Sequence, residues 1–92
     1  MSKRLSWKVT VGTTKVQLPT SNLNDSVIIK ADTDNAGSIY LGNDGEDSVS
    51  ASTGFELQAG EYLIFDQVGK LGDIYAIASE ADQYLYIMIG KV

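Results

Sequence analysis

Only side chains bearing oxygen, amide or amine groups are available for chemistry in this chain. Its 92 residues include neither histidine nor cysteine, which removes the commonest general base, the reactive thiol and the usual zinc ligands. Neither of the glycine-rich phosphate-binding patterns occurs. Paired carboxylates remain, but a domain of this size with short turns offers little room for the cleft that glycoside hydrolysis requires. The sequence therefore predicts a protein that is not an enzyme and that uses no cofactor.

The loop that begins at Asp32 comes nearest to a metal-binding pattern. A calcium loop of the EF-hand type needs oxygen ligands at its first, third and fifth positions, glycine at the sixth and glutamate at the twelfth. Asp32, Asp34 and Gly37 fit, whereas the fifth and twelfth positions hold Ala36 and Asn43. The flanking residues are typical of strands, not helices. The pattern therefore favours a hairpin turn stabilised by Asx hydrogen bonds over a metal site.

A longer polar stretch, residues 42–54, contains the second acidic cluster. Asp44, Glu46 and Asp47 lie there among glycine and hydroxyl residues, and Val49 and Ala51 are its only apolar side chains. This composition is typical of a long exposed loop. A solvated acidic loop is favoured, and a weak cation site is the alternative.

The charges are unevenly distributed along an acidic chain of net charge −5. An acidic protein repels phosphates, so no nucleic-acid partner is expected. No apolar run approaches the ~18 residues of a membrane span, and no signal peptide is recognised. Residues 1–4 form a short basic tail, and Lys3, Arg4 and Lys8 are candidates for contact with an acidic partner surface.

Turn-forming residues divide the chain into about eight short segments with the patterns of β-strands. In the first of them Trp7 alternates in phase with Leu5, Val9 and Val11, which predicts that the indole packs in the core. Residues 26–31 and 38–41 are expected to form a hairpin. No helical periodicity persists. The expected fold is all-β, a compact antiparallel β-sandwich, jelly-roll-like, with residues 1–92 as one domain. The predicted strands are 5–11, 16–18, 26–31, 38–41, 55–57, 62–66, 73–79 and 84–89.

The later strands carry more apolar side chains than one core face can use. Residues 62–65, 74–78 and 84–89 are apolar on both faces, and four of the five tyrosines lie in this half. A sandwich strand normally shows water a polar face, and Tyr, Met and Phe are enriched at interfaces. We therefore expect a homo-oligomer, with a trimer favoured. The candidate interface residues are Leu63, Phe65, Tyr75, Tyr84, Tyr86 and Met88.

Three stretches in order resemble a known group of proteins. Residues 27–42, 53–61 and 73–79, followed by Tyr84-Leu-Tyr-Ile87, are similar to small β-sandwich virion structural proteins of tailed bacteriophages, of the capsid decoration or cement type. The resemblance implies a protein made in the host cytoplasm that binds the major capsid protein on the capsid surface. It implies no catalytic residues. A tail or fibre module that recognises a host glycan is the alternative, and a structural domain unrelated to phage is a third possibility.

The predicted absence of a calcium ligand set has a direct consequence for stability. Because the loop at Asp32 lacks its fifth and twelfth ligands, folding should not depend on calcium. Thermal melts recorded with calcium and with a chelator should coincide. A melting temperature that falls by many degrees in chelator would show that a cation is part of the fold.

Overall fold

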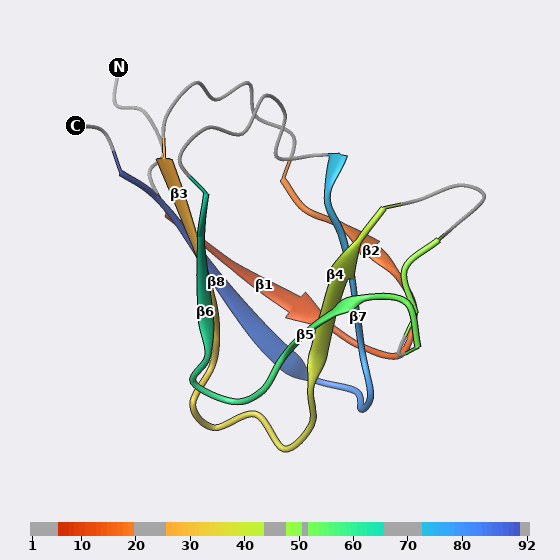
Figure 1. Cartoon of the computed structure of the whole chain (residues 1–92). Coiled ribbons are helices and arrows are strands. Elements are labelled where there is room, and N and C mark those ends of the chain that lie inside the picture. Colours follow the sequence, from red (N-terminus) through yellow and green to blue (C-terminus); the bar gives the residue numbers. More distant parts are fainter. Residues whose placement is uncertain (1–5, 20–25, 44–47, 51, 66–72, 91–92) are drawn as a thin grey trace.

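The computed structural model describes residues 6–19, 26–43, 48–50, 52–65 and 73–90. These residues form eight β-strands (Figure 1), and among them no helix has the length and apolarity that a membrane span requires. The strands are β1 (Ser6–Val11), β2 (Val16–Gln17), β3 (Ser26–Ala31), β4 (Ile39–Gly42), β5 (Phe55–Leu57), β6 (Tyr62–Phe65), β7 (Tyr75–Ala78) and β8 (Gln83–Gly90). They lie within a few residues of the predicted bounds.

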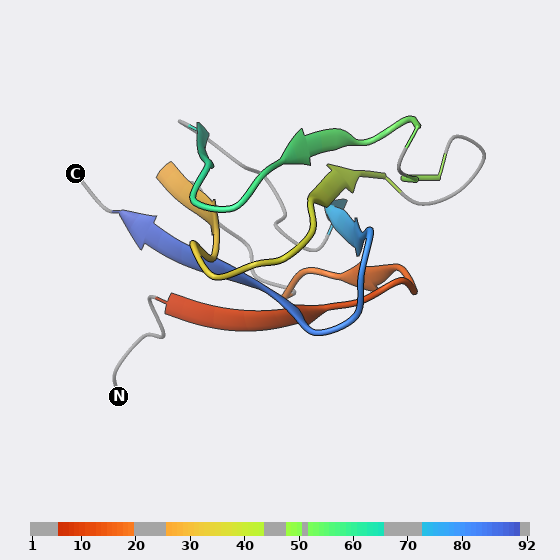
Figure 2. The same ribbon diagram turned by 90° about the horizontal axis from the view of Figure 1, so that it is seen from below.

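The strands pair into two antiparallel four-stranded sheets. One sheet has the order β1-β8-β3-β6 and the other β2-β7-β4-β5, and Figure 2 shows β1 and β8 running side by side along one margin of the molecule. Along the chain, consecutive strands alternate between the two sheets, except for β4 and β5, which are neighbours in one sheet. An eight-stranded double sheet of this order is a jelly roll. The predicted all-β, jelly-roll-like sandwich is confirmed.

The core lies between the two sheets and is built by alternation along each strand. In β3, Val27, Ile29 and Ala31 are fully buried, while the residues between them face out. In β8, Leu85 and Ile87 occupy the corresponding inner positions. Trp7 packs against this cluster but is only half-buried. The predicted inward direction of the indole is confirmed, and its burial is partial. The buried cluster is Val11, Leu18, Val27, Ile29, Ala31, Ile39, Leu41, Leu57, Ala76, Ala78, Leu85 and Ile87.

The predicted hairpin between residues 26–31 and 38–41 is wrong. β3 pairs with β6 on one edge and with β8 on the other, so it has no free edge for β4, which pairs with β5 and β7 in the opposite sheet. The connection is therefore a corner that carries the chain from one layer to the other. The Asx component of the prediction is confirmed, because the Asp34 amide donates to Oδ1 of Asp32 at 3.1 Å.

Side-chain amides fix this corner against the start of β8. The Asn35 side-chain amide donates to the Tyr84 carbonyl (3.0 Å), and its Oδ1 accepts from the Tyr84 amide (2.9 Å). Asn35 thus bonds both backbone groups of one residue, as a neighbouring strand would. The buried Gln83 side chain accepts from the Gly37 amide at 2.9 Å and donates to the Ala81 carbonyl at 2.8 Å.

The stretch between β4 and β5 is anchored to the sandwich instead of being wholly exposed. Val49 is buried, and its amide donates to the Asn43 carbonyl at 2.8 Å. A Cβ on Gly42 or Gly54 would lie within 3.0 Å of the Val49 side chain. The two glycines therefore leave the space that the Val49 side chain occupies. The acidic residues 44–47 lie outside the described residues, and the prediction of a solvated acidic loop stays a prediction.

The turn before β6 contains a glycine with a positive φ angle. Gly60 has φ = +84°, a conformation that glycine adopts without a steric penalty. Its amide donates to the Ala31 carbonyl at 3.1 Å, and the Glu61 carbonyl accepts from the Ala31 amide at 2.9 Å. The turn therefore extends the pairing of β3 with β6 and sets the register of β6.

We predict that Asn35→Ala destabilises the fold by roughly 1–3 kcal/mol, because it leaves two backbone groups of Tyr84 without their side-chain partner. In a domain of this size each kcal/mol lowers the melting temperature by about 4–8 °C. Asn35→Asp keeps the acceptor but removes the donor, so it should also lower the melting temperature. Asp34→Ala, at a neighbouring exposed side chain, is the control. Equal melting temperatures for all the variants would show that the corner does not depend on this amide.

Candidate functional site

The most distinctive surface is the side of the β1-β8-β3-β6 sheet that points away from the core, called here the outer face. Eight exposed residues on it form two rows that cross all four strands. The strand registers define the rows. In the order β1, β8, β3 and β6, the first row is Ser6, Met88, Ile28 and Ile64. In the same order, the second row is Lys8, Tyr86, Lys30 and Tyr62.

The first row is aliphatic over three of its four strands. Met88, Ile28 and Ile64 are 54%, 38% and 57% exposed. They are direct cross-strand neighbours on β8, β3 and β6, so their exposed surfaces adjoin. Scattered apolar residues on a surface are ordinary, but a contiguous apolar patch marks an interaction site.

The second row alternates lysine with tyrosine across the sheet. Lys8, on β1, places its Nζ 4.3 Å from the centroid of the Tyr84 ring and 5.8 Å from that of Tyr86. Both distances are within the range of a cation–π interaction. The Tyr86 hydroxyl donates to Oδ2 of Asp32 at 3.3 Å. Tyr62, on the edge strand β6, is 60% exposed.

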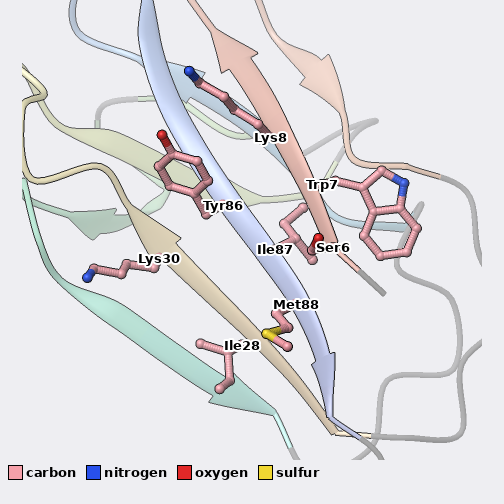
Figure 3. Close-up of a pocket in the computed structure, with 8 residues that line it drawn as sticks. All are labelled: Ser6, Trp7, Lys8, Ile28, Lys30, Tyr86, Ile87 and Met88. Atoms are coloured by element: carbon pink, nitrogen blue, oxygen red, sulfur yellow. The ribbon is translucent and has the colours of Figure 1, made fainter. Parts of the chain in front are cut away.

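A shallow hollow of about 560 Å³ lies over three of the four strands of this face. Figure 3 shows side chains from β1, β8 and β3 around it, with the Trp7 indole directed away beyond β1. Of the β6 side chains that the structure describes, none lines the hollow, so Tyr62 and Ile64 lie beside it. The lining residues are Ser6, Trp7, Lys8, Ile28, Lys30, Tyr86, Ile87 and Met88.

The structure places four of the predicted interface and contact residues on the outer face. Tyr86 and Met88 are exposed in its centre, and Lys8 is exposed on β1. Tyr84 is half-buried on the same strand as Tyr86, under the Lys8 ammonium. These four residues form one continuous surface.

The other predicted residues do not join this surface. Leu63 points inward and packs against the core, and Tyr75 is half-buried in the opposite sheet, with its ring 5.5 Å from the Nζ of Lys15. The side chain of Phe65, and Lys3 and Arg4, lie outside the described residues. The predicted interface set is therefore divided between different sides of the molecule.

The sequence did not identify five residues of the outer face, which are Ser6, Ile28, Lys30, Tyr62 and Ile64. A signal was present for Ile28, because residues 27–29 are apolar without interruption. For β6 the sequence indicated two apolar faces but not which of them turns inward. The structure shows that Tyr62 and Ile64 turn outward and that Leu63 turns inward.

The remaining surfaces offer less for a ligand. Among the residues described, no group of three acidic side chains could hold a metal ion. A second hollow of about 440 Å³ is almost wholly apolar, and Asn43 supplies the one polar side chain among its described lining residues, which are Leu41, Gly42, Asn43, Phe55, Leu63 and Ile74. The outer face is thus suited to binding a surface that is partly apolar, with Tyr and Lys side chains to orient it.

Comparisons of the chain with protein-family models, with curated proteins and with solved structures find no match. The outer face and the jelly-roll topology therefore carry the functional argument.

Proposed function

We propose that this protein is a non-enzymatic structural protein of a virion, a capsid decoration or cement protein that assembles with copies of itself and binds the head shell. The outer face is the observation that supports this proposal most directly. It presents a contiguous patch of Met88, Ile28 and Ile64 beside the row of alternating Lys and Tyr, and Met and Tyr are residue types enriched at protein interfaces. Viral capsid domains are among the proteins built as jelly rolls, and this likeness is one of fold alone.

The mechanism follows from repetition. A decoration protein bridges neighbouring subunits of a shell that holds DNA under pressure, so each added contact resists separation of those subunits. Individual contacts of a 92-residue domain are modest, but many copies on one closed shell act together, and multivalent binding exceeds the affinity of a single contact. Such a role needs a stable fold and a surface for assembly, and it needs no catalytic groups.

A tail or fibre module that binds a host glycan is the second candidate, and one observation favours it. Tyr62 and Tyr86 are exposed on one row with Lys8 and Lys30, and aromatic rings beside cations suit an acidic sugar. The adjoining row of three aliphatic side chains is unsuited to a sugar and favours a protein partner.

The proposal predicts that the purified protein binds shells that lack it. Co-sedimentation with undecorated shells should saturate, and decorated shells should keep their DNA to a higher temperature. Ile64→Lys should weaken binding about 10-fold or more, since it places a charge in the apolar patch. Phe55→Lys is the matched control, because Phe55 is 58% exposed on the opposite sheet.

Two results would contradict the proposal. One is a failure of the wild-type protein to bind shells at any concentration tested. The other is saturable binding to an acidic glycan that Ile64→Lys leaves intact and that Lys30→Gln abolishes, which would favour the fibre module.

A further inference from the structure

We infer that the partner of the outer face is a second copy of the chain, bound face to face about a two-fold axis that runs along the strands between β8 and β3. The inference rests on the proposed function in one respect, that the outer face is an assembly surface, and it names the occupant and its register. Two-fold contacts bring the same patch of both copies together, so the patch must be complementary to itself.

The Lys–Tyr row has this property. Rotation about the proposed axis exchanges β1 with β6 and β8 with β3, so the row Lys8–Tyr86–Lys30–Tyr62 meets its own reverse. Lys8 of one copy then faces Tyr62 of the other, and Tyr86 faces Lys30. Every lysine meets a tyrosine ring or hydroxyl, and no lysine meets a lysine. Lys8 already lies 4.3 Å from a tyrosine ring within its own chain, so contacts of this kind are compatible with the face.

The aliphatic row is complementary under the same rotation. Met88 of one copy faces Ile28 of the other, which buries apolar surface on both sides. Ile64 faces Ser6, the smallest side chain on the face. In this row, the large side chain on the β6 edge of one copy therefore meets the small side chain on the β1 edge of the other.

The relief of the face supports the same arrangement. The hollow of about 560 Å³ lies over β1, β8 and β3, and Tyr62, Leu63 and Ile64 of β6 do not line it. Tyr62 and Ile64 of β6 are the two most exposed large apolar side chains of the face, at 60% and 57%. The rotation lays β6 of each copy over β1 of the other, which places this ridge at the hollow.

The charges are compatible with burial in this register. Lys30 is central on the face and would face Tyr86, whose hydroxyl donates to the Asp32 carboxylate at 3.3 Å. That hydroxyl has a lone pair available to accept from the Lys30 ammonium of the second copy. An axis perpendicular to the strands would instead set Lys30 on Ile28 and leave the ammonium on an apolar side chain, which is unfavourable.

The size of the face indicates the strength of the contact. Four strands about 4.8 Å apart and a β8 of eight residues at about 3.3 Å each give a footprint of roughly 500 Å². A standard interface buries about 800 Å² on each partner. The dimer should therefore be reversible, with a Kd in the micromolar range or weaker.

The first test is sedimentation equilibrium of the full chain over a wide concentration range. The wild type should pass from monomer to dimer. Ile64→Lys should raise the dimer Kd by about 30-fold or more, and Phe55→Lys should leave it unchanged. A trimer, a wild type that stays monomeric at millimolar concentration, or equal Kd values for the two variants would overturn the inference.

The second test reports the register and uses the absence of native cysteine. Lys8→Cys and Tyr62→Cys are single variants at exposed positions on opposite edges of the sheet. A short thiol-to-thiol cross-linker should join the two variants when they are mixed. It should join neither variant to itself, because equivalent edges lie about 14 Å apart laterally in the proposed dimer. Cross-linking within each variant alone, or none in the mixture, would overturn the two-fold register.

The two proposals fail in different ways. A wild type that binds shells but never dimerises overturns the second-copy inference and leaves the proposed function standing. A dimer with the expected register that binds no shell retains the inference on self-assembly and overturns the role in the virion.

Discussion

The structure depends on the apolar contact between the inner faces of the two sheets, and β8 is at its centre. β8 pairs with β1 on one side and with β3 on the other, and Leu85 and Ile87 are buried beneath it. Since side chains alternate along a strand, the burial of these two residues forces Tyr86 and Met88 outward. The core and the outer face are therefore two consequences of one alternation. A shift of β8 by one residue would expose its core residues and bury its tyrosines.

The number and position of the strands could be predicted because each shows its own local pattern. The partners of each strand could not, because pairing depends on residues far apart in the sequence. Residues 26–31 and 38–41 are separated by a turn-forming segment and look like a hairpin, yet β3 is enclosed by β6 and β8. The bonds that convert that segment into a corner come from Asn35 to Tyr84, 49 residues away, and no local pattern indicates them.

The candidate site could be predicted in part. Where a strand is apolar at every position, the sequence does not show which of its alternating side chains turn outward. For β8 the sequence indicated Tyr84, Tyr86 and Met88 as one set, and the structure places them on one side of the strand. For β6, a run of four apolar residues has two equivalent choices, and the choice is made by pairing with β3 after the turn at Gly60. That pairing directs Leu63 to the core and sets Tyr62 and Ile64 beside Lys30 and Ile28.

The lysines of the outer face explain how an exposed apolar patch can be specific. An exposed patch of aliphatic side chains invites association in any orientation, but the second row restricts it. If two copies slip by one strand from the two-fold register, Lys8 of one copy faces Lys30 of the other, or Lys30 faces Lys30. Like charges brought together in an interface cost several kcal/mol. The aliphatic row thus supplies most of the attraction, and the alternation of Lys with Tyr selects the register, which is the division of roles that a specific assembly surface requires.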